Sequence, residues 1–541
     1  MVTSDGAKAE DLQPRSFLFA SAVAEKGKQR EQAFWNFGGR RDATYYSTQL
    51  AERLARTVVD RVLALFDAVQ PPAGEMPVVL GPGVTGILLH EAIGHGMEAD
   101  FNRKKMLDLC AWVIDRARKA GADACKASVT RNRSVEIRYR DRKPETIKES
   151  ITQRVGLELY VNRRYSGQST SDLRKTSLAD FVANAVAATR LLAADPYRSL
   201  PDPKYYQGRP EVDLRIVDPS QARVTSEQRH RFAQQIETAC LQAGGHKVIS
   251  VTAGAGDGFS ESATMTSNGF VGSVEATNYG AGAEMAAQDE GDRRPNGYYS
   301  VRTHLGSQVP EPALVGETAA RRTLDLLGAR KLKTETLPVI IENQNVPRVL
   351  GGFLDAMSAR NIQQKQSFLA DKKGQRIGSR RFTLIDDPLL PNGLGSRLFD
   401  GDGFPARKRT MVEAGQVQEF FADWYYSRKL QWEPTTGGSS NLLIPPGHRS
   451  VQEIMKDLGR GVYITDFIGG NSNPTTGDFS VGIVGCLFAG GVRTQPLAEM
   501  NIAGNHLKFW QQLAEAANDP WPYSSWRMPS LVFTDVVVSG V

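Results

Sequence analysis

The alternation of apolar and polar residues along the chain predicts a helix, a strand and a second helix near the N-terminus. Apolar residues recur at helical spacing over 50–66, which predicts an amphipathic helix. Pro71, Pro72 and Gly74 end this pattern, and the apolar run 76–80 predicts a short buried strand. The turn residues Gly81-Pro82-Gly83 then lead into a second predicted helix.

The same order of elements returns after residue 310. The run Met76-Pro77-Val78-Val79-Leu80 corresponds to Leu337-Pro338-Val339-Ile340-Ile341, an offset of 261 residues. The aligned positions of the preceding helix are Leu54, Val58 and Val62 in the first copy and Val315, Ala319 and Thr323 in the second. This repeat indicates an internal duplication, with chance periodicity as the alternative.

The remaining segments predict an α+β fold, with an α/β N-terminal part and a β-rich C-terminal domain. Helical spacing occurs over 107–119, 178–192 and 226–243, and strand-like runs over 135–140, 157–161 and 247–252. The proline-rich stretch 196–210 is typical of a linker, and beyond residue 330 glycine and proline turns separate short strands. The predicted domains are residues 1–105, 106–210, 211–325 and 326–541.

Composition places the chain among ordinary globular proteins. Of its 541 residues, 40% are hydrophobic and 23% charged, with 66 basic and 60 acidic residues. The net charge of +6 comes without a dense basic stripe, which argues against nucleic-acid binding. The four cysteines are far apart, and neither a signal peptide nor an apolar run of membrane-spanning length is visible. We therefore expect a cytoplasmic protein that binds neither nucleic acid nor membrane.

The most distinctive candidate chemistry is His90-Glu91-Ala92-Ile93-Gly94-His95. Two imidazoles and a carboxylate are the groups that a hydrolytic metal site requires. Histidines five positions apart lie about 140° apart on an ideal helix, so both can bind one metal only if the helix ends or bulges between them. Gly94 and Gly96 favour such an ending. Glu91 would then act as general base on a metal-bound water. The alternative is an ordinary pair of histidines at a helix end.

A third metal ligand is not evident from the spacing. Glu98 and Asp100 lie close enough in sequence to bind the metal or support a ligand, although carboxylates after a helix are common. Cys486 is a further candidate, with inert core packing as its alternative. The second copy has Gly351, Gly352 and Ala356 where the first has His90, Glu91 and His95. One copy therefore carries the motif and the other lacks it.

Other polar runs have simpler interpretations. Asp386-Asp387-Pro388 and Phe399-Asp400-Gly401-Asp402-Gly403 could hold calcium or act in acid–base chemistry, but their composition favours turns. Gly254-Ala255-Gly256-Asp257-Gly258 lacks the lysine of a phosphate-binding loop and is expected to be a plain loop. Trp521, Tyr523 and Trp526 are either core anchors or part of a partner-binding face.

With these motifs, the chain resembles the TldD/TldE (PmbA) metalloprotease family. Residues 1–105 resemble an internal TldD segment. Two runs carry this resemblance, 72–81 and 90–103, and the second begins with the HExxxH motif. Residues 106–541 resemble a whole TldE subunit. The segments that carry this likeness are Ser367-Phe368-Leu369-Ala370-Asp371, Asp386-Asp387-Pro388, Asn473-Pro474-Thr475-Thr476-Gly477-Asp478-Phe479-Ser480 and Ile502-Ala503-Gly504-Asn505.

The resemblance implies roles for several residues. His90 and His95 match the family's histidine ligands and Glu91 its catalytic acid, with zinc, or alternatively iron, as the metal. The family's third ligand is a cysteine near the TldD C-terminus, and no cysteine follows Cys486 here. The fusion of the two pieces is either genuine or the product of a deletion or a gene-model error.

Two functions follow as hypotheses. The first is a metallopeptidase component acting on cytoplasmic, largely unfolded peptides, with its third ligand from Glu98, Asp100, Cys486 or a partner chain. The second is a catalytically inactive TldE-type subunit that binds a complete TldD partner as a heterodimer. The expected partners are a TldD-type subunit or a second copy of the chain, together with a peptide substrate. Regulation of DNA gyrase has only an old family label in its favour.

Overall fold

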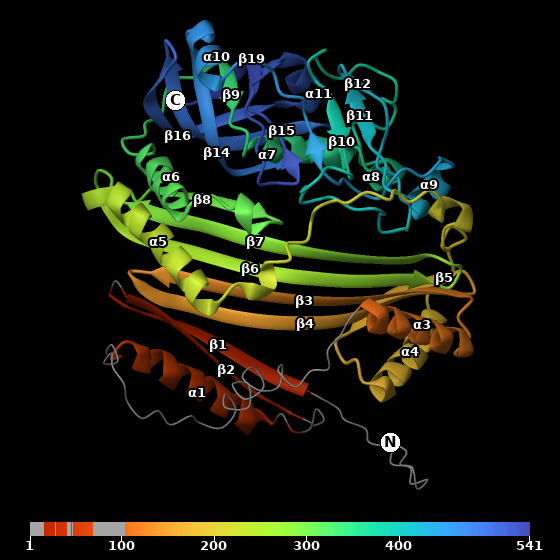
Figure 1. Cartoon of the computed structure of the whole chain (residues 1–541). Helices are drawn as coiled ribbons and strands as arrows, with labels where there is room; N and C mark the ends of the chain where they lie inside the picture. The colour runs from red at the N-terminus through yellow and green to blue at the C-terminus, as the bar shows by residue number, and fades with distance from the viewer. Residues whose placement is uncertain (1–15, 28, 40–44, 46, 69–102) are drawn as a thin grey trace. The chain divides into compact units, whose positions relative to one another are not determined.

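The computed structural model describes residues 16–27, 29–39, 45, 47–68 and 103–541 (Figure 1). The chain forms two compact units, residues 1–96 and 97–541, and each is considered by itself. The predicted strand 76–80 and the predicted helix with His90 and Glu91 lie outside the described residues.

The first unit contains an antiparallel hairpin and one helix. Strands β1 (Ser16–Lys26) and β2 (Gln29–Gly39) pair along their whole length, and α1 (Thr48–Leu65) packs on them. The Ser47 hydroxyl accepts a 3.2 Å hydrogen bond from the Leu50 amide and caps the helix. The predicted helix over 50–66 is confirmed.

The helices of the second unit are α3 (Arg103–Lys119), α4 (Lys175–Thr189), α5 (Ser226–Gly244), α6 (Pro312–Leu324), α7 (Val346–Ala356), α8 (Ala359–Gln363), α9 (Trp424–Leu430), α10 (Val451–Leu458) and α11 (His506–Phe509). Its strands are β3 (Ala124–Arg140), β4 (Lys143–Val161), β5 (Arg164–Thr170), β6 (Val248–Thr266), β7 (Val271–Ala287), β8 (Asn296–Thr303), β9 (Glu335–Ile341), β10 (Leu384–Asp386), β11 (Arg409–Glu413), β12 (Gln416–Val417), β13 (Leu442–Leu443), β14 (Arg460–Ser472), β15 (Asp478–Ala489), β16 (Val492–Asn505), β17 (Leu513–Ala516), β18 (Trp526–Arg527) and β19 (Leu531–Ser539).

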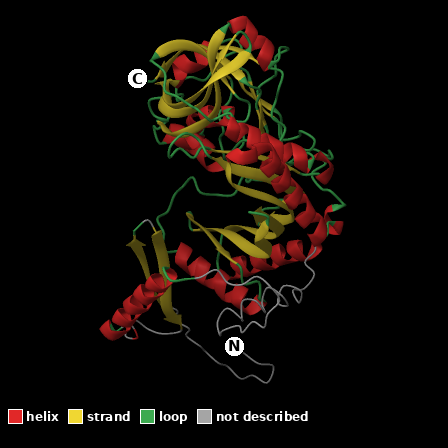
Figure 2. Cartoon of the chain, turned by 90° about the vertical axis from the view of Figure 1, so that its left-hand side faces the viewer, coloured by secondary structure: helices red, strands yellow, loops and turns green. Residues whose placement is uncertain are grey.

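A six-stranded antiparallel sheet with the order β5-β4-β3-β6-β7-β8 dominates residues 124–303. Because β3 pairs with both β4 and β6, the predicted segments 106–210 and 211–325 supply strands to one sheet. The odd-numbered residues of β3 contact the helices: Val129 shares a core with α3 and α4, and Ile137 packs near α5. Alternation along a strand therefore puts these helices on one face of the sheet (Figure 2).

The glycine-rich run 254–258, expected to be a loop, lies in the interior of β6. A Cβ atom on Gly256 would lie 2.5 Å from the Val135 carbonyl oxygen of β3. Asp257, within the same run, is 4% exposed and accepts two hydrogen bonds from the Arg229 guanidinium, at 2.5 and 2.9 Å. The loop prediction is wrong because glycine also occurs where two strands approach closely.

The C-terminal part is rich in strands, as predicted. Its six-stranded sheet has the order β16-β15-β14-β9-β19-β17, and an additional pairing of β16 with β19 gives it a barrel-like form. A second, five-stranded sheet has the order β12-β11-β10-β13-β18. A large buried core of aliphatic and aromatic side chains joins the two, and Trp526 packs against it. Trp521 and Tyr523 pack against the core between α5, α6 and the first sheet. These three partly buried aromatic residues pack against core clusters, which favours the core-anchor alternative.

The two duplicated copies agree in the burial of their helices. Leu54, Val58 and Val62 are the buried residues of α1, and Val315, Ala319 and Thr323, at the same offset, are all buried in α6. A hairpin precedes the helix in both copies: β1–β2 in the first and β7–β8 in the second. This agreement favours duplication over chance periodicity.

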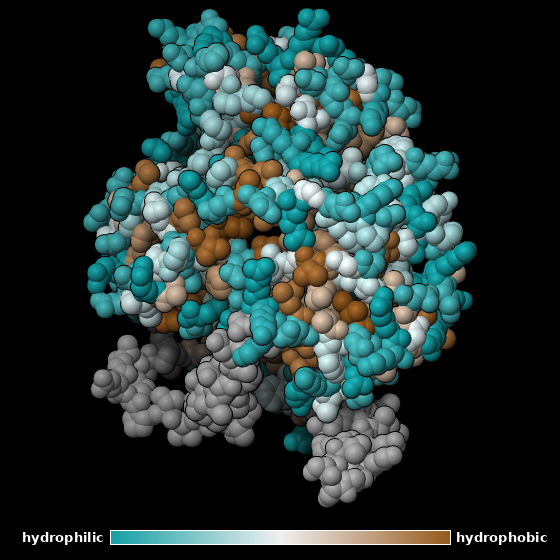
Figure 3. Space-filling model, turned by 45° about the vertical axis from the view of Figure 1, so that its right-hand side comes forward, coloured by the Kyte–Doolittle hydropathy of each residue, from teal (hydrophilic) through white to brown (hydrophobic). Residues whose placement is uncertain are grey.

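In the view of Figure 3, hydrophilic side chains predominate, and apolar ones gather in patches near the middle of the face shown. Among the described residues, no helix has both the length and the apolar character needed to span a lipid bilayer.

Candidate functional site

The residues of the predicted metal site, His90, Glu91 and His95, lie outside the described residues, as do Glu98 and Asp100. Their geometry stays a prediction. Among the residues that the structure describes, no group of three or more His, Cys, Asp or Glu side chains could hold a metal ion.

Cys486, the other predicted ligand, lies in β15 and is 8% exposed. It packs in a core with Ile340, Met455 and Phe488. Burial raises the pKa of its thiol to about 11, so the thiol is protonated at neutral pH. Its surroundings are those of a core side chain, and its role as a ligand stays a prediction.

The second copy of the motif lies on α7. This helix directs Val349, Phe353 and Leu354 into the core, while Gly351 and Gly352 line a cavity of about 340 Å³. Further residues that line this cavity, here called the α7 pocket, are Arg348, Asp355, Gly470, Asn471, Ser472, Phe479 and His506. The helix ends at Ala356, the counterpart of His95.

A Ser–His pair occupies the space beside Gly352. Ser472 Oγ and His506 Nε2 share a 2.9 Å hydrogen bond. A Cβ atom on Gly352 would overlap Ser472 Oγ and lie 2.9 Å from His506 Nε2. Gly351 has open space instead, with no neighbouring atom within 4 Å of an added Cβ. The second copy therefore lacks the donor side chains and also has no room for a side chain in place of Glu91.

His506 is held as a neutral, buried ring. It is 2% exposed, stacks on Phe368 with a centroid distance of 5.6 Å, and lies 5.0 Å from the Phe479 ring. Burial lowers its pKa to about 4, and its Nδ1 atom has no hydrogen-bond partner. The sequence pattern did not single out His506. The signal was nonetheless present, because the marker segments 473–480 and 502–505 directly adjoin Ser472 and His506.

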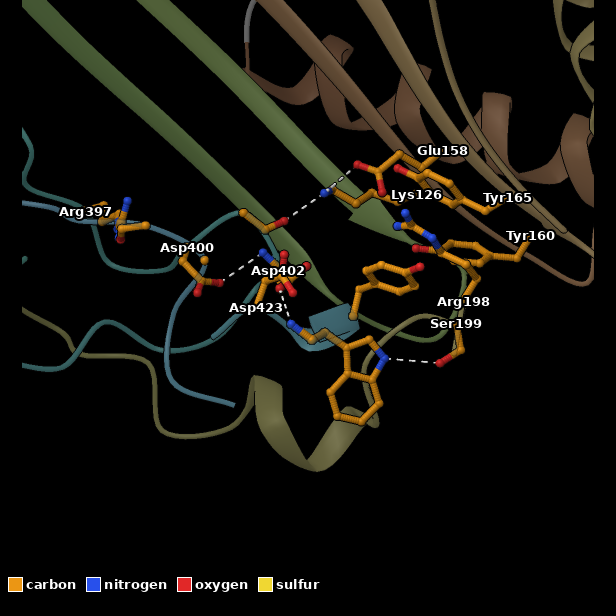
Figure 4. Close-up of a pocket in the computed structure, with 15 residues that line it drawn as sticks. Lys126, Glu158, Tyr160, Tyr165, Arg198, Ser199, Arg397, Asp400, Asp402 and Asp423 are labelled. Atoms are coloured by element: carbon orange, nitrogen blue, oxygen red, sulfur yellow. Dashed lines mark hydrogen bonds and ion pairs between the residues drawn. The ribbon is translucent and has the colours of Figure 1, made fainter. Parts of the chain in front are cut away.

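A second cavity, of about 350 Å³, lies where the first sheet meets loops of the C-terminal part (Figure 4). We call it the acidic pocket. Lys126 of β3 bonds to Glu158 of β4 at 2.8 Å and donates to the Gly401 carbonyl at 2.7 Å. Trp424 Nε1 donates to Ser199 Oγ at 3.1 Å. The pocket thus connects the sheet, the linker and the C-terminal part.

Three carboxylates give this pocket its character. Burial, together with the nearby charges of Asp400 and Asp423, raises the pKa of Asp402 to about 6. Asp402 accepts a 2.9 Å hydrogen bond from the Trp424 amide. Asp400 accepts bonds from the amides of Asp402 and Phe404 through one oxygen, while its buried Oδ2 has no partner. The turn predicted for residues 399–403 is confirmed, and its carboxylates connect segments of the chain.

Family models match most of the chain. The model for the PmbA/TldA metallopeptidase C-terminal domain matches residues 334–540, and that for domain 1 matches residues 125–189. The central-domain model matches residues 1–66 as well as 219–327. The hairpin and helix of the first unit therefore match the same domain type as the segment that contains α5 to α6.

Proteins similar to this chain are named as metalloproteases of the PmbA and TldD types. Metalloprotease PmbA of Escherichia coli O157:H7 is 26% identical over 423 residues, which are 77% of this chain and 93% of that protein. The metalloprotease TldD homolog of Haemophilus influenzae is 40% identical over 110 residues, but these cover only 19% of this chain and 23% of that protein.

Solved structures agree with this fold. A Bacteroides thetaiotaomicron protein described as a putative modulator of DNA gyrase is 32% identical, with a TM-score of 0.79. The match spans 81% of this chain and 100% of that protein. TldE from Thermococcus kodakarensis has a TM-score of 0.71 at 19% identity. The match spans 80% of this chain and 100% of that protein. The predicted α+β class is confirmed.

Proposed function

The chain belongs to the PmbA/TldD metallopeptidase family, and from this premise we propose that it is a metallopeptidase component acting on cytoplasmic, largely unfolded peptides. The observation that carries the proposal is the contrast between the two copies. The first has His90, Glu91 and His95, whereas the second has two glycines and an alanine.

The donor chemistry of the first copy suits a divalent metal. Neutral imidazoles bind zinc well, and iron is the alternative. We assign His90 and His95 as ligands and Glu91 as the general base that accepts a proton from the attacking water. The bound metal would supply Lewis-acid activation. The end of α7 at Ala356 supports this assignment, because a helix that ends at the corresponding His95 would free that ring to turn toward His90.

A second candidate function is that of a catalytically inactive TldE-type subunit, which binds a complete TldD-type partner. The match to 93% of a PmbA relative, against 23% of a TldD homolog, favours it. The buried His506 and the two glycines of the α7 pocket are also compatible with a non-catalytic role.

Metal analysis of the purified chain tests the first function. We expect about one zinc or iron per chain in the wild type and a loss of most of this metal in His90→Ala. Gly351→Ala, at the corresponding position of the second copy, serves as the matched control and should keep its metal. Equal metal contents in wild type and His90→Ala would refute the metallopeptidase assignment.

Addition of a full-length TldD-type subunit separates the two functions. If the chain is an inactive subunit, it should co-purify with that partner, and His90→Ala should leave the peptidase activity of the complex unchanged. If the chain supplies its own site, His90→Ala should abolish the activity of the chain alone.

A further inference from the structure

The face of α7 that lines the α7 pocket carries two opposite charges with a gap of glycines between them. Arg348 and Asp355 are exposed and line this cavity, and Gly351 and Gly352 lie between them on the same side of the helix. At the helical rise of about 1.5 Å per residue, seven residues separate the Cα atoms of the charged pair by about 10.5 Å. The pocket therefore presents a cation at one end and a carboxylate at the other.

This pair of charges is a property of the second copy. At the offset of 261 residues, Arg348 and Asp355 correspond to Ile87 and Gly94 of the first copy, which are uncharged. The pair therefore has no counterpart in the segment that carries the metal-binding motif. Neither side chain belongs to the core against which α7 packs, so packing does not require the charges either.

A bulge of β14 forms another wall of the pocket and holds the cation. The ladder between β14 and β15 is interrupted between Ile468 and Asn471, and the two glycines there have positive φ and line the cavity. The Arg348 guanidinium donates a 2.7 Å hydrogen bond to the Gly469 carbonyl oxygen. A guanidinium has further N–H donors in the same plane, which suit a carboxylate ligand.

Ser472 supplies a neutral donor between the two charges, beside Gly352. Among the described residues, the Nδ1 atom of His506 has no hydrogen-bond partner. Buried N–H groups rarely lack an acceptor, so the proton of this neutral ring is on Nε2. Nε2 then donates to Ser472 Oγ across 2.9 Å. The hydroxyl proton of Ser472, which is exposed, can therefore be donated to a carbonyl oxygen in the pocket.

We propose that the α7 pocket binds short peptides of about three residues through both of their free termini. The C-terminal carboxylate binds to Arg348, the α-ammonium to Asp355 and a peptide carbonyl to Ser472. An extended chain spans about 3.3–3.6 Å per residue, so three residues match the helical separation of about 10.5 Å. The cavity of about 340 Å³ has the size of an ordinary ligand pocket.

The source of the ligand rests on the proposed function. Peptide hydrolysis releases short peptides that carry both an ammonium and a carboxylate, and these are the two groups that the charged pair recognises. The second copy thus acts as a product-binding site, although it lacks the metal-binding motif. Binding itself needs only residues of the second copy and is measured without any peptidase activity.

Isothermal titration calorimetry of the full-length chain with trialanine tests the proposal. We expect trialanine to bind. Trialanine amide, which lacks the carboxylate, and N-acetyl-trialanine, which lacks the ammonium, should each bind about tenfold more weakly. Pentaalanine is too long to place both termini on the charged pair and should also bind more weakly.

Two variants assign the termini. In Arg348→Gln, trialanine and its amide should bind equally, and in Asp355→Asn, trialanine and its N-acetyl form should bind equally. A general structural defect would not remove the discrimination at one terminus and keep it at the other. Gly351→Leu fills open space in the pocket and should abolish binding. Arg360→Gln, at an exposed arginine of α8, is the matched control and should keep both preferences.

His90→Ala separates this inference from the proposed function. It changes only the first copy and should leave the affinity for trialanine unchanged. Loss of trialanine binding in His90→Ala, no binding to the wild type, or discrimination that survives in Arg348→Gln and Asp355→Asn would each overturn the proposal. An unchanged metal content in His90→Ala would refute the metallopeptidase assignment without affecting the binding result.

Discussion

The two duplicated copies differ in how completely they are enclosed. In the second copy, β7 pairs with β6 on one side and with β8 on the other, and α6 packs against α5. In the first copy, β1 pairs with β2 alone among the described strands, and Val59 and Leu63 of α1 are 46% and 52% exposed. Among the described residues, the copy whose sequence has Gly351, Gly352 and Ala356 is the more enclosed one.

The largest expected difference comes from one substitution made at the same position of both copies. Ala320→Glu places a carboxylate where no surface is exposed, and we expect it to lower the free energy of unfolding by about 3–5 kcal/mol. Val59→Glu, at a site 46% exposed, should change it by less than about 0.5 kcal/mol. Urea unfolding measures both. Equal effects would mean that the two helix sides are equally enclosed.

A smaller effect is expected from refilling the vacant motif positions of α7. Gly352→Glu forces a side chain against Ser472 and His506 and should destabilise the chain by about 1–3 kcal/mol. Gly351→Glu, one residue earlier, enters open space and should stabilise the helix by roughly 0.5–1 kcal/mol. Thermal unfolding of the two variants should therefore shift in opposite directions. If both variants lost stability equally, the Ser–His pair would not be what fills the site.

A further expected effect concerns the pH dependence of stability. Burial lowers the pKa of His506 from its usual 6.5 to about 4, so the unfolded chain takes up a proton at a higher pH than the folded chain does. Its contribution to stability is present above pH 6.5 and is lost as the pH falls toward 4. At pH 5.5 we expect a loss of roughly 1 kcal/mol relative to pH 8. His506→Asn should remove this part of the pH dependence, and an unchanged slope would contradict the assignment.

Local patterns predicted the helices well because their apolar periodicity matches their burial. The spacing of Leu54, Val58 and Val62 was sufficient to predict α1 and its buried ridge. The α+β class and the β-rich C-terminal part also followed from turn composition. The glycine-rich strand β6 could not be predicted in this way. Gly256 lies in a strand because it pairs closely with the backbone of β3, which is more than a hundred residues away in sequence.

The candidate site was predictable in its chemistry but not in its surroundings. The donors His90, Glu91 and His95 can be recognised from the sequence alone, and their arrangement stays a prediction. The Ser472–His506 pair beside Gly352 depends on the meeting of β14 and α11 with α7, and no short-range pattern encodes this meeting. The link between Lys126 and Gly401 likewise joins segments that are distant in sequence.

The barrel-like sheet also has a consequence for synthesis on the ribosome. Strand β9 lies between β14 and β19, and Leu337 is opposite Val536, so this sheet cannot be completed until β19 has left the exit tunnel. At about 5–20 residues per second, the N-terminal hairpin emerges many seconds before that moment. The β1–β2 hairpin can therefore form long before the barrel-like sheet closes.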